Sequence, residues 1–196
     1  MIMAYLSLIV ECLIFSELSS LYNFDSYTNE ALGIFIVLIN ILVVILVGVF
    51  KSSKGDEKIC KIILLSFVMR VGLLFIDLYG RNVFVLPGSG NDTEMFHAGA
   101  LLFPNFEFEK NPYAFVVGII YSLCMKQRIV AQYFNLLLSI SVIFIIIKIC
   151  DELNINYKTK IMITLIIALI PNYMILSVIL LRESLMIFLV ALSLLT

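Results

Sequence analysis

Uninterrupted apolar runs, each about 20 residues long, constrain the fold of this chain more than any other feature. Apolar residues make up 62% of its 196 residues, against roughly 45–50% in an average soluble domain. Backbone in lipid must satisfy its own hydrogen bonds, so only helices and closed barrels cross a membrane, and barrel strands alternate polar with apolar residues. The sequence therefore predicts an all-α polytopic bundle of transmembrane helices.

Hydrophobicity also predicts where the helices lie. The segment 113–125 is apolar but too short to cross about 30 Å of hydrocarbon, so we expect it at the interface or re-entering. We interpret residues 1–58 as an N-terminal addition of two spans and a basic loop. We interpret residues 59–196 as the N-terminal part of one membrane domain, because its last apolar run is too short to cross a membrane. The expected spans are 2–18, 31–50, 59–79, 129–147 and 161–181, with another opening at 183.

Basic residues predict the orientation. Lysines gather in the loops 51–58 and 148–160, whereas the loop 16–30 has acidic residues and no Lys or Arg. Cytoplasmic loops carry the excess of basic residues, so we place the first two loops in the cytoplasm and 16–30 outside. The long loop 80–112 is then outside too, if only one full crossing separates it from 148–160. This topology requires the short basic turn 126–128 to face outward.

Charge and cysteine spacing exclude several classes of function. The net charge of −1 leaves no basic surface for nucleic acid. The cysteine spacing matches no metal motif, so we interpret all four as buried small apolar residues. They are Cys12, Cys60, Cys124 and Cys150.

A polar, acidic island at 86–97 interrupts the apolar sequence. Its proline and glycines predict a turn, and Ser89 with Asp92 three residues later resembles a capped helix start. Asp92 would then lie in the first turn of a short amphipathic helix over 92–102, where the helix dipole favours a carboxylate. Two interpretations stay open: Asp92 is a general base for an acceptor hydroxyl, or it only starts the helix.

Glu94 and His97 follow in the same predicted helix. Glu94 lies about 200° around the helix from Asp92, so the two carboxylates make a weak metal motif. His97 shares a face with Glu94 and is the sole histidine of the chain. A single histidine is more often structural than a ligand, and it argues against a zinc site in this segment.

Charged residues also occur in or near the predicted spans. Asp77 and Arg81 are four residues apart and can pair directly. Arg70 lies near the middle of its span, where an unpaired charge is costly, so it must face protein or water. This group is either a polar site in the outer half of the bundle or a structural ion pair.

Two short basic turns are candidate phosphate or headgroup sites. Arg182 and Glu183 separate two apolar runs at the predicted outer surface, where Arg can bind a lipid phosphate with two hydrogen bonds. The alternative is that Arg182 and Glu183 only form a solvent-exposed connection between the two apolar runs. The turn 126–128 has Tyr113 and Tyr121 nearby, which is typical of membrane anchoring, with headgroup binding as the alternative.

From residue 59 on, the order of these segments resembles the GT-C superfamily of integral-membrane glycosyltransferases. The similarity is strongest to the protein mannosyltransferase and aminoarabinose-transferase-like branch and to related bacterial surface-polysaccharide enzymes. It rests on the outer loop with Asp92, on Asn111-Pro112-Tyr113 before a short apolar helix, on Gln132-Tyr133-Phe134-Asn135, on Ile170-Pro171-Asn172 and on Leu181-Arg182-Glu183-Ser184.

The resemblance implies transfer of a sugar from a polyprenyl-phosphate-linked donor to a glycan, lipid or protein acceptor, at the extracytoplasmic face of a bacterial plasma membrane. Asp92 and Glu183 would be the catalytic acidic residues, and a divalent metal ion is left open as a cofactor. The sequence departs from the family in having Asp-Thr-Glu in place of an adjacent acidic pair. The residues expected to bind substrate are Arg182, Glu94, His97, Arg81 and Tyr113.

Two other classes of protein compete with this interpretation. A cell-envelope polysaccharide polymerase or ligase usually relies on outer-loop arginines, whereas the loop here is more acidic than basic. A transporter, flippase or accessory subunit would place polar residues and broken helices at mid-membrane, where the sequence offers only Arg70.

Overall fold

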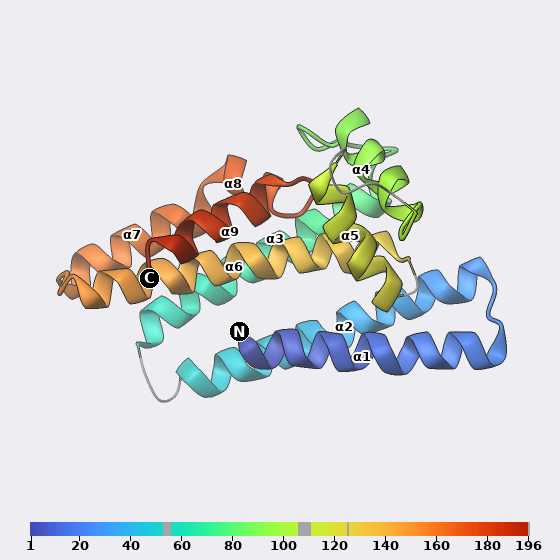
Figure 1. Ribbon diagram of the computed structural model, residues 1–196. Helices are drawn as coiled ribbons and strands as arrows, with labels where there is room; N and C mark the ends of the chain where they lie inside the picture. The colour runs from blue at the N-terminus through green and yellow to red at the C-terminus, as the bar shows by residue number, and fades with distance from the viewer. Residues whose placement is uncertain (53–55, 106–110, 125, 196) are drawn as a thin grey trace.

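The computed structural model describes residues 1–52, 56–105, 111–124 and 126–195. Within these residues the chain is all-helical and contains no strand (Figure 1). The helices are α1 (Ile2–Tyr22), α2 (Ser26–Ser52), α3 (Glu57–Tyr79), α4 (Asn91–Leu101), α5 (Pro112–Leu123), α6 (Arg128–Glu152), α7 (Tyr157–Leu169), α8 (Pro171–Leu176) and α9 (Glu183–Ser193).

Four of the described helices, α1, α2, α3 and α6, are long and apolar enough to cross a membrane. They confirm the predicted all-α membrane architecture and the first four predicted spans. Helix α6 is the most deeply buried of them and packs against α2, α3, α5, α7 and α9. Helix α2 contacts both α3 and α6, so helices from the two predicted parts of the chain, 1–58 and 59–196, lie against one another.

The predicted span 161–181 is not one helix, which corrects the sequence interpretation. Helix α7 ends at Leu169, Ile170 has φ −58° and ψ 116°, and Pro171 begins the short α8. Proline has no N–H for the preceding turn and disfavours helical backbone in the residue before it. The Ala168 carbonyl near the break accepts hydrogen bonds from Ser66 Oγ at 2.7 Å and Arg70 Nη1 at 2.9 Å. Helix α9 then returns alongside α6 (Figure 1).

Contacts between loops show which loops share an end of the bundle. Lys160 Nζ lies 3.2 Å from Asp56 and 2.9 Å from Asp151, so the two basic loops meet. At the other end, the Tyr79 hydroxyl lies 3.5 Å from a Glu30 carboxylate oxygen, which joins the loop 16–30 to the end of α3. We call this second end the outer end, although its compartment stays a prediction. Residues 53–55 and 106–110, with Lys54 and Lys110, lie outside the described residues.

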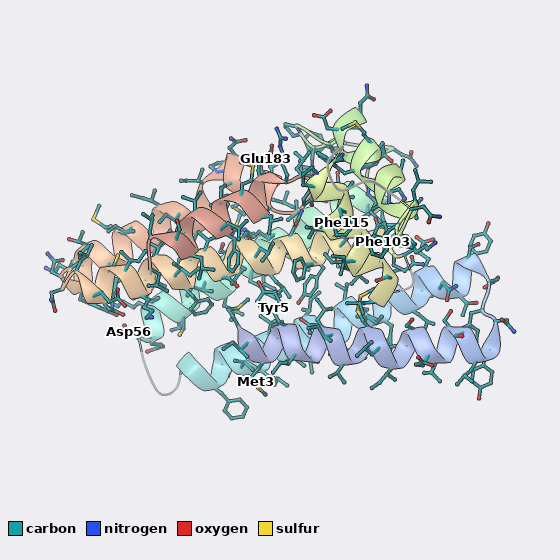
Figure 2. All side chains as sticks on the ribbon, viewed as in Figure 1. Met3, Tyr5, Asp56, Phe103, Phe115 and Glu183 are labelled. Carbon is teal, nitrogen blue, oxygen red and sulfur yellow. A yellow bond between two sulfur atoms is a disulfide. The ribbon has the colours of Figure 1, made fainter. Side chains whose placement is uncertain are left out.

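Helix α5 is short, as predicted, and packs against α4 and α6. Phe103 and Phe115 pack edge to face, with ring centroids 5.3 Å apart (Figure 2). Cys124, just after α5, forms a disulfide with Cys12 of α1, their Cα atoms 4.8 Å apart. Both cysteines are buried, as predicted, but the sequence interpretation missed their disulfide. The two lie 112 positions apart in the sequence, and no local pattern joins them.

Candidate functional site

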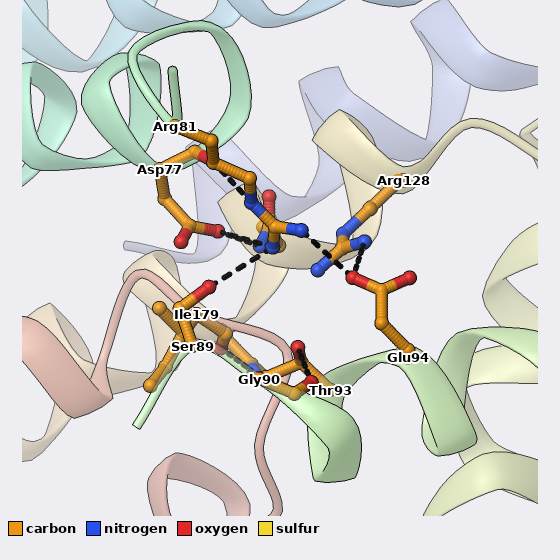
Figure 3. Close-up of polar contacts among 10 residues, drawn as sticks. Asp77, Arg81, Ser89, Gly90, Thr93, Glu94, Arg128 and Ile179 are labelled. Atoms are coloured by element: carbon orange, nitrogen blue, oxygen red, sulfur yellow. Dashed lines mark hydrogen bonds and ion pairs between the residues drawn. The ribbon is translucent and has the colours of Figure 1, made fainter. Parts of the chain in front are cut away.

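Polar side chains from three helices meet at the outer end and form what we call the outer polar cluster (Figure 3). Asp77 lies near the end of α3 and Arg81 in the turn just after it, Glu94 comes from α4, and Arg128 and Gln132 come from the start of α6. Arg128 and Gln132 are four residues apart, so they lie on one face of α6. The cluster therefore brings chain segments that are far apart in sequence to one place.

Asp77 and Gln132 form the buried floor of this cluster. Gln132 Nε2 donates to Asp77 Oδ2 at 2.7 Å, and Arg81 Nη2 lies 3.5 Å from the same oxygen. The predicted Asp77–Arg81 pair is thus confirmed. Asp77 Oδ1 and Gln132 Oε1 are buried without a hydrogen-bond partner among the described residues, and such unpaired buried acceptors are uncommon in folded proteins.

Glu94 bridges the two arginines of the cluster. Its Oε1 accepts a hydrogen bond from Arg81 Nη1 at 2.8 Å and another from Arg128 Nη1 at 2.7 Å. Partial burial alone would raise the pKa of Glu94, but the hydrogen bonds and positive charges of Arg81 and Arg128 outweigh it and lower this pKa to about 2. Glu94 is therefore ionised at neutral pH and occupied by its ion pairs, so it is not a free base.

Ser89 and Gly90 set the start of α4 differently from the prediction. The N-cap residue is Gly90, with no side-chain cap, whereas the sequence predicted Ser89. Ser89 Oγ instead accepts a hydrogen bond from Arg81 Nη2 at 2.9 Å, which takes its hydroxyl away from the helix. Asp92 does lie in the first turn of α4, as expected, and its side chain is exposed, without a hydrogen bond or ion pair in the part of the chain that the structure describes.

The turn before α4 packs against the segment that leads into α9. Gly88 has φ +86°, which favours glycine, and a Cβ built on it would lie 3.3 Å from Ile179 Cδ1. Figure 3 shows Ile179 beside Ser89 and Gly90. The loop before Asp92 and the segment before Arg182 are therefore neighbours, although 90 and more residues separate them in sequence.

Tyr113 and Glu183 lie close to the same segment. Glu183 begins α9 and is half-buried, and its Oε2 has no hydrogen-bond partner among the described residues (Figure 2). Burial raises the pKa of Tyr113, a hydrogen bond from Asn135 opposes this, and the charge of Glu183 adds to the rise. Asn135 Nδ2 lies 2.7 Å from the Tyr113 hydroxyl and 3.1 Å from the carbonyls of Ile179 and Leu181. Asn135 thus fixes the chain path into α9.

His97 contacts α5. Its Nδ1 lies 2.6 Å from the Tyr121 hydroxyl. Burial lowers the pKa of His97, the positive charge of Arg128 adds to this, and Glu94 opposes it. The imidazole is therefore neutral at physiological pH and positioned by one hydrogen bond.

The structure brings some predicted site residues together and leaves others apart. Arg81 and Glu94 pair directly, and Tyr113 lies close enough to Glu183 for the charge of Glu183 to raise the pKa of Tyr113. Arg182 is exposed at the N-cap of α9, and its side chain has no hydrogen bond or ion pair to the rest of the described chain.

The sequence indicated lipid-headgroup binding for Arg128 only as the alternative to membrane anchoring, and it indicated no substrate role for Gln132 or Asn135. Their signal was visible, because all three are polar residues in the first two turns of a long apolar helix. No group of three or more metal-ligating side chains occurs among the described residues. Comparison of the chain with protein-family models, curated proteins and solved structures gives no match in any of the three.

Proposed function

We propose that this protein is a membrane glycosyltransferase of GT-C type, which moves a sugar from a polyprenyl-phosphate-linked donor to an acceptor at the outer end. One observation carries the proposal: an exposed carboxylate, Asp92, lies in the first turn of a surface helix whose next residues join two arginines at the end of the bundle. A lipid-linked sugar phosphate needs cations at membrane-surface depth, and its acceptor hydroxyl needs a base there.

The reaction follows from these groups. The Asp92 carboxylate takes the proton of the acceptor hydroxyl as the acceptor oxygen bonds to the anomeric carbon. The bond from that carbon to the phosphate oxygen breaks, and the polyprenyl phosphate leaves with the electron pair. Cationic side chains at the outer end stabilise the negative charge that builds on the leaving phosphate. Glu183, with an unpartnered carboxylate oxygen, is the second acidic group and binds hydroxyls of the substrate.

Two further features support this placement. An apolar groove of about 250 Å³ lies between α1, α5 and α6, lined by residues such as Ile9, Ile120 and Phe134, and it suits a prenyl chain. The Cys12–Cys124 disulfide lies near the same end, and disulfides persist in oxidising compartments, which favours an extracytoplasmic outer end.

The test is a transfer assay on the protein in membranes supplied with extracted polyprenyl-linked sugars. We expect Asp92→Asn to lower the rate of transfer by about 10²–10⁴-fold, the usual contribution of a general base. Glu17→Gln is the matched control, because Glu17 is an exposed acid of α1 near the same end. Wild-type rates from a folded Asp92→Asn protein would reduce Asp92 to a helix-starting residue.

A second candidate function, a transporter or flippase, is favoured by one specific observation. The break between α7 and α8 lies beside the buried Arg70, and transporters build their sites from broken helices and polar groups at mid-membrane. Reconstituted liposomes that move lipid-linked sugars across the bilayer, without transferring them, would favour this candidate.

A further inference from the structure

Arg128 has unused hydrogen-bonding capacity. Its Nη1 binds Glu94, whereas Nε and Nη2 are buried without a hydrogen-bond partner among the described residues. These two nitrogens lie on one edge of the guanidinium group, the edge that binds two oxygens of a phosphate or carboxylate at once. Leaving a charged donor buried and unpaired is costly, so such an edge indicates a ligand.

Glu94 already holds the place of one oxygen of such a ligand. A single carboxylate oxygen, Oε1, accepts from Arg81 at 2.8 Å and from Arg128 at 2.7 Å. The Glu94 side chain is 50% exposed, against 32% for Arg81 and 16% for Arg128. The glutamate can therefore rotate into solvent more easily than either arginine can leave.

Arg81 stays in place when Glu94 moves. Arg81 donates to the Asp77 backbone carbonyl at 2.8 Å and to Ser89 Oγ at 2.9 Å, independently of Glu94. The two arginines balance the charges of Asp77 and Glu94, so departure of Glu94 leaves one positive charge without a counter-charge. An anion carrying one negative charge restores the balance.

We propose that Arg81 and Arg128 form a binding site for a phosphate-class oxyanion, which Glu94 occupies in the empty protein and leaves when the ligand binds. The phosphate takes the Glu94 position between the two arginines, and the Nε–Nη2 edge of Arg128 becomes available to it once Glu94 has left and the guanidinium group turns. Its source is a prenyl phosphate or free phosphate, and the preference for the lipid rests on the proposed function. This assigns phosphate binding to Arg128, for which the sequence left membrane anchoring and headgroup binding open.

The test is a binding titration of the purified full chain in detergent, by calorimetry, with inorganic phosphate and with farnesyl phosphate as separate probes. We expect Arg128→Gln to weaken binding at least about tenfold through loss of the bidentate edge. Arg128→Lys should not restore it, because an ammonium group lacks that planar pair of donors. Glu94→Gln should tighten binding about tenfold, because an uncharged amide competes less for the two arginines. Lys158→Gln, which removes one positive charge at the opposite end, should leave it unchanged.

Binding of either probe with this pattern supports the site. Binding of inorganic phosphate shows that the phosphate group is sufficient, and binding of farnesyl phosphate but not inorganic phosphate shows that the ligand is a lipid headgroup. The inference is overturned if wild type binds neither probe, or if folded Arg128→Gln, judged by circular dichroism, binds like wild type. The outcome is separable from the transfer assay. If Arg128→Gln binds phosphate like wild type while Asp92→Asn loses sugar transfer, only the phosphate site is contradicted. If the predicted binding pattern is found but the wild type transfers no sugar, only the proposed function is contradicted.

Discussion

Arg70 and Arg128 both lie within the helical bundle, but their guanidinium groups have different surroundings. Arg70 is fully buried and donates to neutral oxygens, Ser177 Oγ at 3.1 Å and the Ala168 carbonyl at 2.9 Å, while the Tyr173 ring lies 5.4 Å away. It pairs with no carboxylate among the described residues. Arg128 instead shares a half-exposed carboxylate with Arg81 at the surface of the bundle.

The difference separates a structural arginine from a binding arginine. Arg70 connects α3 to both sides of the α7–α8 break, so its hydrogen bonds hold the helices that it joins, and a ligand has no exposed path to it. The Arg81–Arg128 pair is reachable from outside, and its present partner, Glu94, is half-exposed. Accessibility and a replaceable partner, more than charge itself, indicate the ligand site. Three measurements test this difference between the two arginines.

The largest expected effect comes from Arg70→Leu. The substitution removes the hydrogen bonds that join α3 to the α7–α8 break, so we expect the free energy of unfolding to fall by about 3–5 kcal/mol. Unfolding by denaturant in mixed micelles, followed by circular dichroism, measures this. Val68→Leu, on the exposed side of α3, is the control. A protein as stable as wild type would show that Arg70 is not structural.

A smaller effect is expected from Gln132→Leu in the floor of the outer polar cluster. The buried Asp77 carboxylate loses its 2.7 Å hydrogen bond, which should cost about 1–3 kcal/mol of unfolding free energy. The same unfolding assay applies, with Leu136→Met as a volume-conserving control on α6. Equal stability of Gln132→Leu and wild type would mean that this buried bond contributes nothing.

The smallest effect is the pH dependence of Glu94. Its pKa is lowered from 4.5 to about 2 in the folded protein, so its ion pairs stabilise the fold above pH 4.5 and are lost as pH falls from 4.5 to about 2. The melting temperature of wild type should fall more steeply across this window than that of Glu94→Gln. Because Glu94 is half-exposed, the difference should be small and should shrink in high salt. Identical slopes for the two proteins would mean that the ion pairs of Glu94 do not stabilise the fold.

The sequence predicted the features that depend on local pattern. Apolar runs located the long helices, and spacing of four residues predicted the Asp77–Arg81 pair. The turn before Asp92 predicted a short helix with Asp92 in its first turn. The break at Ile170 is also visible in the sequence as Pro171 inside an apolar run, a signal that the length of the run obscures.

Long-range partners could not be predicted in the same way. Glu94 and Arg128 are 34 residues apart and belong to different helices, so their contact depends on how α4 folds over the start of α6. The same holds for the Cys12–Cys124 disulfide and for the loop of Gly88 against Ile179. Such contacts follow from the packing of whole helices, which local spacing does not specify.

The most direct measurement is photocrosslinking of a photoreactive prenyl phosphate to the protein in its membrane, with mass spectrometry to locate the adducts. We expect adducts on α4, on the loop 86–90 and on the first turns of α6, and their loss when excess farnesyl phosphate competes. Adducts concentrated around Arg70 and the α7–α8 break instead would contradict a binding site at the outer end and would favour a transporter.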